Sequence, residues 1–240
     1  MMGKIDKVSR ITGVKLDPNS PWLQRRQRDG QGNERSFQDM LKNRKSRLEA
    51  NAPETEAATW EGNGATQSLF YEKGVNLDFF YHQMALKEAV KAYQQGEIPI
   101  GAVLVKNEDG QVVATGFNLR EQTMDATAHA EMEAIRKGCQ ALHRWRLSGC
   151  TLYVTIEPCA MCAGALVNSR IDRLVYGSNE SKFGAVESIF NVVNHKLLNH
   201  RMEVVAGVLE DECRQLMKSF FYMRRLQNKA RKQKQHELDC

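Results

Sequence analysis

The pattern of hydrophobic and polar residues divides the chain into two parts. Residues 1–75 show little apolar periodicity and are rich in Gln, Asn, Gly, Arg and Glu, as in WLQRRQRDGQGNERS and ANAPETEAATWEGNGATQS. Such a segment buries too little apolar surface to offset the entropy lost on ordering. We therefore expect a polar, largely disordered N-terminal extension, in which apolar residues at helical spacing predict one short helix over residues 36–48.

The pattern leaves three explanations for this extension open. Its polar composition favours a solvated leader, which has no fixed fold. A docking segment for a partner is the second explanation. A start codon assigned too far upstream is the third.

Beyond the extension, apolar positions recur with periods that predict alternating helices and strands. Helical spacing over residues 77–95 predicts an amphipathic helix, with Gly96 as its C-cap. Two β-branched runs joined by NEDG predict a hairpin over residues 98–106 and 112–117. The later pattern predicts strands at 150–157, 170–177 and 202–208, and helices after His129, after the motif PCAMC and from Glu210 to about Leu226. Strands that alternate with helices indicate an α/β layered sheet.

Composition argues against a membrane span and against a disulfide scaffold. Hydrophobic residues make up 42% of the chain and charged residues 26%, and no apolar run approaches the ~18 residues that cross a membrane. The N-terminus also lacks the apolar core of a signal peptide. Six cysteines are too few and too unevenly spaced for a disulfide framework. We therefore expect a cytoplasmic protein with no membrane partner, whose cysteines are thiols or metal ligands.

Positive charge is concentrated near the C-terminus. The formal net charge is +5, which permits a nucleic-acid partner without requiring one. Residues 220–240 hold six Arg or Lys against one Glu and one Asp, a local balance of 6 − 2 = +4. This cluster favours contact with phosphates, although a solvated tail is the usual explanation for such a run.

Two short motifs carry the candidate chemistry. TAHAEMEAIRKG holds His129 and Glu131, and EPCAMCAG holds Cys159 and Cys162. Alone, the first could be a polar pair at a helix start, and the second a redox pair, half of a zinc ribbon or two core thiols. A ribbon needs a second CxxC motif, which the sequence lacks, and Pro158 weakens the redox interpretation. Together, H-x-E followed by P-C-x-x-C is the signature of zinc-dependent nucleoside and nucleobase deaminases.

The residue types suit a catalytic zinc ion. Zn²⁺ binds thiolate and imidazole, and a catalytic site uses three protein ligands and leaves the fourth position to water. His129, Cys159 and Cys162 are the three expected ligands, and the two cysteines converge because residues three apart share one helix face. Zinc lowers the pKa of its water toward ~7. We expect Glu131 to accept the proton released from that water and return protons to the substrate.

From about residue 77 to residue 226, the chain resembles the bacterial tRNA-specific adenosine deaminases. The resemblance is carried by EIPIGAVLV, GFN, DATAHAEMEAI, TLYVTIEPCAMCAGALVNSRI, VYGSNESKFGA, NHRMEV and FFYMRR. It implies a three-layer α/β/α fold with a mixed five-stranded sheet, a homodimer with one Zn²⁺ per subunit, and conversion of adenosine to inosine at the wobble position of tRNA anticodon loops. It also divides the chain into an extension (1–75), a zinc-dependent deaminase domain (76–226) and a basic C-terminal tail (227–240).

The resemblance also assigns roles to individual residues. It places the metal ligands at His129, Cys159 and Cys162 and the proton shuttle at Glu131. It implies that six further residues bind the substrate: Asn118, Glu180, Lys182, Phe221, Arg224 and Arg225. Asn118 would read the flipped base, although an Asx turn after the hairpin explains it equally well from sequence. Core packing is the better explanation for an aromatic residue at position 220 or 221.

Two other functions compete with tRNA deamination. A deaminase of a free base or nucleoside, of the guanine or cytosine type, would share the metal site, because pocket shape rather than motif spacing selects the substrate. A structural zinc module that binds RNA would be non-enzymatic. The open fourth ligand position and Glu131 argue against that module, because structural zinc is normally closed by four protein ligands.

Overall fold

Helix α5 (Leu77–Gln94) is the first element in the structure, a computed structural model that describes residues 76–238. Asn76 caps it, because the Asn76 side chain accepts a hydrogen bond of 3.2 Å from the backbone N–H of Phe79. The chain leaves the helix at Gly96, whose φ of +80° favours glycine. The predicted helix over residues 77–95 is confirmed. The expected disordered extension and its helix at 36–48 lie outside the described residues.

The sheet contains five strands in the order β2-β1-β3-β4-β5. Their bounds are β1 Gly101–Lys106, β2 Val112–Phe117, β3 Cys150–Ile156, β4 Arg173–Ser178 and β5 Glu203–Ala206. Strand β1 runs antiparallel to β2 and β3, whereas β3, β4 and β5 run parallel. The mixed five-stranded sheet is therefore confirmed. Strand β1 begins at Gly101 rather than at residue 98 because Pro99 cannot donate a ladder hydrogen bond.

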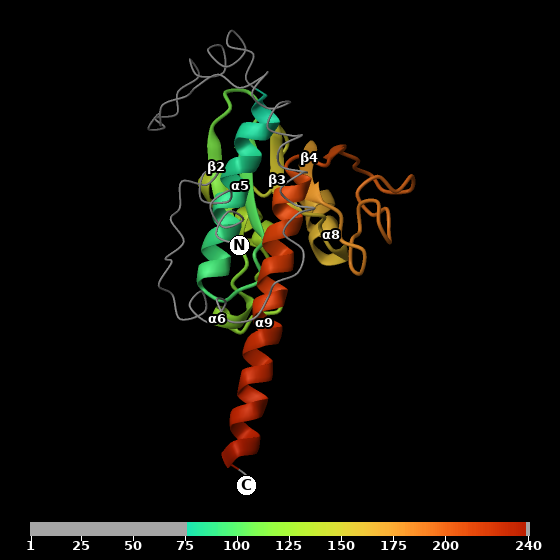
Figure 1. The fold of residues 1–240 in the computed structure, drawn as a ribbon. Coiled ribbons are helices and arrows are strands. Elements are labelled where there is room, and N and C mark those ends of the chain that lie inside the picture. The colour runs from blue at the N-terminus through green and yellow to red at the C-terminus, as the bar shows by residue number, and fades with distance from the viewer. Residues whose placement is uncertain (1–75, 239–240) are drawn as a thin grey trace, which may run out of the picture.

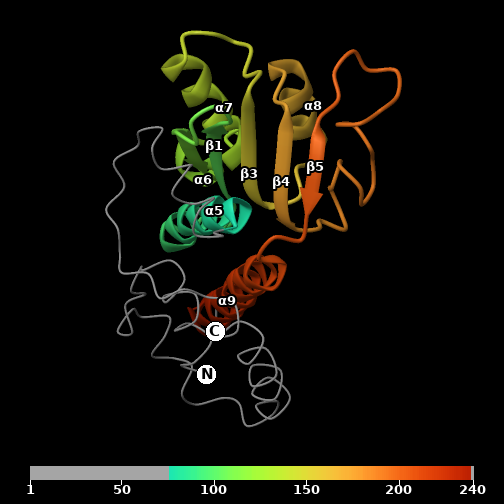
Figure 2. The same cartoon turned by 90° about the horizontal axis from the view of Figure 1, so that it is seen from above.

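Helices cover both faces of the sheet (Figure 2). One face packs against α5 and α9 (Glu210–Leu238), and the other against α7 (Ala130–Ala141) and α8 (Ala160–Ser169). Alternate residues along each strand therefore enter different cores. On β3, Leu152 lies in the core with α7 and α8, whereas Tyr153 packs against α5. This confirms the three-layer α/β/α fold.

Gly116 lets the start of α7 approach the sheet. A Cβ atom at this position would lie 2.3 Å from the carbonyl oxygen of Ala130, closer than any real contact. Helix α7 therefore begins directly against β2, which fixes the position of His129 just before it.

Helix α9 is longer than the sequence pattern predicts. The expected end near Leu226 is wrong, because the helix continues to Leu238 and projects beyond the body of the molecule (Figure 1). The last dozen residues are mainly Gln, Lys, Arg and Glu, which favour helix without needing a buried face. The basic C-terminal segment is thus an extension of a helix. A further short helix, α6 (Arg120–Thr123), was not predicted.

No helix within residues 76–238 is both long enough and apolar enough to cross a membrane.

An ion pair ties the start of α5 to β4. Two guanidinium nitrogens of Arg173 donate hydrogen bonds of 2.7 and 2.8 Å to the carboxylate of Asp78. The hydroxyl of Tyr153 donates a third hydrogen bond, of 3.0 Å, to the same carboxylate. The bond from Arg173 outweighs burial and lowers the pKa of Asp78 below its usual range.

We expect Asp78→Asn to lower the free energy of unfolding at neutral pH by about 1–3 kcal/mol, since it removes the charged acceptor of two Arg173 hydrogen bonds and leaves the more exposed Glu203 as the charged partner of Arg173. Because the folded pKa of Asp78 is lowered, its contribution is complete above the usual carboxyl pKa and is lost as pH falls through the folded pKa. Urea unfolding at pH 7 and in acid should therefore show a difference from the parent that shrinks in acid. The exposed ion-pair variant Glu108→Gln is the control and should change stability by less than about 1 kcal/mol. An equal loss at both pH values would contradict this account.

Candidate metal centre

Three potential metal ligands converge from two helix starts. His129 is the residue just before α7, and Cys159 is the residue just before α8. Cys162 lies one turn into α8 and is fully buried. The Nδ1 atom of His129 lies 3.7 Å from Sγ of Cys159 and 3.6 Å from Sγ of Cys162. The two motifs, 30 residues apart in sequence, thus form one group.

The spacing of these atoms fits zinc. Tetrahedral Zn²⁺ with nitrogen at about 2.0 Å and sulfur at about 2.3 Å separates the nitrogen from each sulfur by about 3.5 Å. The observed separations of 3.6 and 3.7 Å lie close to this value. The three ligand atoms all lie within 4.8 Å of one another. One imidazole and two thiols also form the donor set of the zinc deaminases.

The thiols of Cys159 and Cys162 shift each other's pKa in opposite directions. The hydrogen bond from Cys162 lowers the pKa of Cys159 to about 4, with further help from His129 and against the effect of burial. That same bond raises the pKa of Cys162, as do burial and the charge of Glu131. The hydrogen bond to Cys159 likewise raises the pKa of His129. Two adjacent sulfurs thus share one negative charge, and a divalent cation would allow both to bind as thiolates.

Glu131 lies beside these ligands and is almost fully buried. Its side chain is 3% exposed, and burial raises the pKa of Glu131 to about 7, against the opposing effect of His129. Within the described part of the chain, its Oε2 atom has no hydrogen-bond partner. A buried carboxyl oxygen without a partner is costly unless a ligand or water completes it. This arrangement suits a group that exchanges protons near pH 7.

Asn118 lies at the end of the hairpin and is 1% exposed. Its Oδ1 atom accepts a hydrogen bond of 2.9 Å from the backbone N–H of Ala130. The side chain thus satisfies one of the free N–H groups at the start of α7, next to His129. Contact between Asn118 and the substrate base stays a prediction.

The loop after β4 lies against the metal-binding turn. Gly184 pairs with Cys159 in an isolated β-bridge, and the N–H of Ala185 donates a hydrogen bond of 2.8 Å to the carbonyl of Pro158. Glu180 and Lys182 lie on this loop, with Lys182 exposed, and the carboxylate of Glu180 accepts a 2.9 Å hydrogen bond from the backbone N–H of Lys182. The loop that carries these two residues thus contacts the turn formed by Pro158 and Cys159. Contact of Glu180 and Lys182 with the substrate stays a prediction.

The predicted residues on α9 are not joined to the metal ligands by direct contacts. Phe220 is buried and packs edge-on against Tyr93, whereas the neighbouring Phe221 is 42% exposed. Arg224 and Arg225 are exposed, and the guanidinium of Arg224 lies over the ring of Phe220. The core-packing interpretation thus applies to Phe220 rather than Phe221. The substrate-binding role of Phe221, Arg224 and Arg225 stays a prediction.

Glu157 is a residue to which sequence reasoning gave no role. It precedes Pro158 and Cys159 and is 3% exposed. Its carboxylate accepts hydrogen bonds from the loop after β4. Glutamate is normally exposed, so the only sequence signal is its place at the end of an apolar strand.

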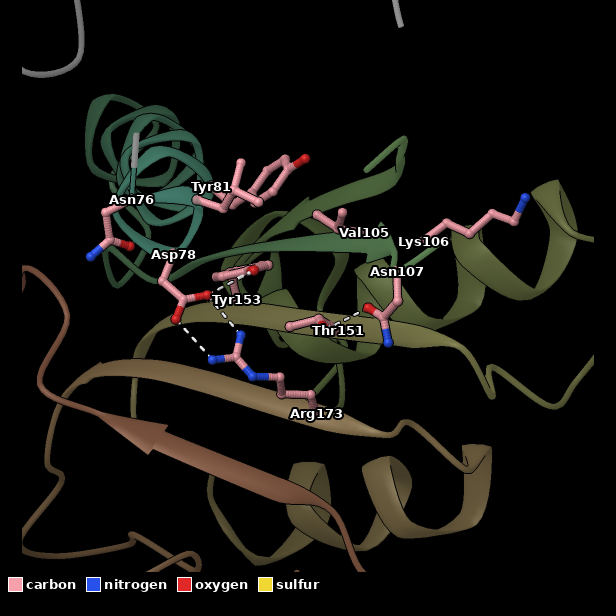
Figure 3. A pocket seen from close by; sticks show the side chains of 10 residues that line it. Asn76, Asp78, Tyr81, Val105, Lys106, Asn107, Thr151, Tyr153 and Arg173 are labelled. Atoms are coloured by element: carbon pink, nitrogen blue, oxygen red, sulfur yellow. Dashed lines mark hydrogen bonds and ion pairs between the residues drawn. The ribbon is translucent and has the colours of Figure 1, made fainter. Parts of the chain in front are cut away.

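A cavity of about 370 Å³ opens at the other end of the sheet (Figure 3). It is lined by residues from the start of α5, the end of β1 and the starts of β3 and β4, among them Asp78, Asn107, Thr151 and Arg173. Its polar side chains bond to one another, as in the 2.7 Å bond from the Thr151 hydroxyl to Asn107 Oδ1. This cavity lies away from the metal ligands, which follow the far ends of the strands.

The fold and the site define a class of enzyme. A mixed five-stranded sheet lies between two helix layers, and one histidine, two cysteines and a buried glutamate lie at the starts of α7 and α8. This is the arrangement of the zinc-dependent deaminases. Residues 76–225 match the family described as MafB19-like deaminase, and the chain belongs to this family.

Two curated relatives are tRNA-specific adenosine deaminases. The chain is 48% identical over 153 residues to the protein of Bacillus subtilis (strain 168). This alignment covers 64% of this chain and 94% of the relative. It is 47% identical over 148 residues to the protein of Haemophilus influenzae, with coverage of 62% and 85%. The alignments thus span most of each relative and leave about a third of this chain unmatched.

Solved structures give the same fold. A structure from a study of A-to-I editing by tRNA deaminases at the wobble position is 44% identical, has a TM-score of 0.55, and covers 57% of this chain and 98% of that one. Guanine deaminase from Nitrosomonas europaea is 21% identical, has a TM-score of 0.53, and covers 71% and 88%. The second likeness concerns the fold alone.

Proposed function

We infer that this chain catalyses the hydrolytic deamination of adenosine to inosine at the wobble position of tRNA anticodons. The inference is carried by 48% identity that extends over 94% of a tRNA-specific adenosine deaminase. The chemistry is carried by His129, Cys159 and Cys162, which lie together beside the buried Glu131. The overall reaction converts adenosine and water into inosine and ammonia.

The residues divide the work between holding a metal and moving protons. His129, Cys159 and Cys162 would hold one Zn²⁺ per chain, and zinc, when bound, supplies a Lewis acid that makes water acidic near neutral pH. Glu131 accepts the proton of the attacking water, since its pKa lies at about 7. It passes that proton to the purine ring nitrogen, and then moves the proton of the hydroxyl newly bonded to the purine carbon onto the departing amine, which leaves as ammonia. The fold keeps this carboxyl away from bulk solvent, since the residue is 3% exposed.

An anticodon loop is a suitable substrate for a buried site. The exocyclic amine of adenosine is unreachable in stacked RNA, whereas an unpaired loop base can be splayed into a pocket. We propose that Asn118 reads the flipped base and that Glu180 and Lys182 contact the flanking nucleotides. Phe221, Arg224 and Arg225 would meet the RNA farther from the reacting base.

Exposed basic residues on α9 support an RNA partner. Figure 1 shows that α9 passes the end of the sheet where α6 lies and continues away from the body. Exposed basic residues in the second half of α9 include Arg224, Arg225, Lys229, Arg231 and Lys232. An extended positive helix can follow a phosphate backbone.

Replacing Arg224 and Arg225 together by glutamine should raise KM for tRNA and flatten its dependence on salt. Each lost phosphate contact should reduce the slope of log KM against log salt by about 0.7 to 0.9, whereas kcat should change little. Steady-state kinetics across a salt series measures both quantities. Gln227→Ala, on the same helix, is the control and should leave the slope unchanged. An unchanged slope in the arginine variant would remove these residues from the RNA surface.

We also propose that the protein works as a homodimer in the cytoplasm. Several large apolar side chains on the segment between β4 and β5 are exposed in the single chain: Phe183, Ile189, Phe190, Leu197 and Leu198. A group of exposed apolar residues favours burial against another chain. Sedimentation equilibrium would test this, and a monomer at micromolar concentration would contradict it.

The experiment that tests the function uses a tRNA with adenosine at the wobble position and a matched tRNA with guanosine there. Nucleoside mass spectrometry after incubation should find one inosine per adenosine-bearing tRNA and none in the matched tRNA. Inosine at another position, or none, would contradict the proposal.

A further inference from the structure

The buried carboxylate of Glu157 gathers a whole loop around itself. Its Oε1 atom accepts hydrogen bonds from the backbone N–H groups of Val186, Glu187 and Ser188, at 3.1, 2.8 and 2.9 Å. Its Oε2 atom accepts one from the N–H of Glu180, at 2.9 Å, and a short one from the Ser188 hydroxyl. Five donors from one loop, residues 180–188, thus converge on a single side chain. Hydrogen bonds to an ionised acceptor are about twice as strong as neutral ones.

The same loop is attached to the metal-binding turn. The N–H of Ala185 bonds to the carbonyl of Pro158, and Gly184 pairs with the ligand Cys159. The fit leaves no space at Gly184, where an added Cβ atom would lie 2.4 Å from Oε2 of Glu157. The loop thus wraps closely around the carboxylate while its backbone touches the segment that holds the metal.

Glu157 is not placed to react with a substrate. It is 3% exposed and both of its oxygens are occupied by donors from the loop. The carboxylate of Glu131, in contrast, has an oxygen without a partner in the described residues. The two buried glutamates near the metal ligands therefore have different roles. Glu131 has an oxygen available for proton transfer, whereas both oxygens of Glu157 bind the loop.

We propose that Glu157 is the positioning residue that holds the loop of residues 180–188 in its RNA-binding form before the RNA arrives. The proposal rests on the function inferred above. The loop carries Glu180 and the exposed Lys182. A loop that is already ordered binds RNA without an ordering cost, whereas a released loop must be ordered on binding. Loss of the acceptor therefore acts on substrate affinity more than on the chemical step.

Glu157→Gln is the variant that tests this proposal. Glutamine keeps the shape and one oxygen, but its amide nitrogen donates and cannot accept a hydrogen bond from the N–H of Glu180. Ser188→Ala removes only the hydroxyl and leaves the carboxylate in place, so its effect should be smaller. Glu203→Gln is the matched control, since Glu203 pairs with Arg173 at the other end of the sheet.

Hydrogen exchange followed by mass spectrometry measures how well the backbone amides of the loop are protected, and it needs no substrate. In zinc-loaded Glu157→Gln, peptides that cover residues 179–190 should exchange at least about tenfold faster than in the parent protein. Peptides from β3 and α7 should be unchanged, as should every peptide of Glu203→Gln. Unchanged protection of the loop would overturn the structural part of the proposal.

Steady-state kinetics with tRNA measures whether the variant loses substrate affinity. Glu157→Gln should raise KM by about tenfold or more and change kcat by less than about threefold, with one zinc per chain retained. A loss of kcat at unchanged KM, or a loss of zinc, would overturn the positioning role. If the variant does not fold, Ser188→Ala should show the same KM effect at smaller size, and its absence would count against the proposal. If the parent protein is inactive on tRNA, the proposed function is contradicted. Hydrogen exchange would still test whether Glu157 orders the loop of residues 180–188, because it needs no substrate.

Discussion

Replacing Glu131 by glutamine should lower kcat for tRNA deamination by about 10³-fold or more, with zinc still bound. Glutamine has nearly the same shape but cannot accept and return a proton, and proton transfer by a positioned group contributes about 10²- to 10⁴-fold. The effect falls on kcat because the lost interaction belongs to the transition state. Single-turnover inosine formation at saturating enzyme measures it, and metal analysis shows whether zinc remains.

Glu133→Gln provides a matched control for this experiment. Glu133 lies two residues farther along α7, and its half-buried carboxylate pairs with Arg136 at 2.7 Å. This change should alter kcat by less than about twofold, since the carboxylate of Glu133 is already engaged by the partly exposed Arg136. Activity in Glu131→Gln within about tenfold of the parent protein would show that another group moves the protons.

Replacing Cys162 by alanine should abolish zinc binding and activity together. Cys162 is fully buried, and its sulfur lies 3.6 Å from the Nδ1 atom of His129. Its removal leaves one imidazole and one thiolate, too few protein ligands for a catalytic zinc site. Metal analysis of protein purified with added zinc should find less than about a tenth of an ion per chain, and inosine formation should fall below detection.

Cys139→Ala serves as the control for the metal site. Cys139 lies near the end of α7, and its thiol contacts the carbonyl of Trp145 rather than the metal ligands. This variant should keep one zinc per chain and full activity. Zinc at one ion per chain in Cys162→Ala would contradict the ligand assignment, whatever its activity.

The sequence predicts the architecture because its signals are local. Buried strands appear as continuous β-branched runs, and α5 shows helical spacing followed by Gly96. The metal group follows from two short motifs, since a P-C-x-x-C turn at a helix start fixes two ligands at once. Only the folded sheet shows that the N-termini of α7 and α8 meet, which brings His129 to both cysteines.

Other features depend on contacts distant in sequence. Nothing near Glu157 shows that a loop more than 20 residues later supplies its hydrogen bonds. Asn118 appears as a turn residue in sequence, and only the structure shows its bond to the start of α7. The length of α9 was missed because the pattern requires an apolar face, whereas its polar end is helical through propensity alone. Residues that bind RNA are exposed by nature, so packing does not identify them.

Purified protein incubated with a total tRNA pool, beside separate incubations with free adenosine, guanine and cytosine, shows most directly which substrate is deaminated. We expect ammonia and inosine from tRNA alone, with the inosine at wobble positions and no product when Glu131 is replaced by glutamine. Ammonia from a free base or nucleoside, with tRNA unmodified, would contradict it: the metal chemistry would stand, but the substrate would be a small molecule.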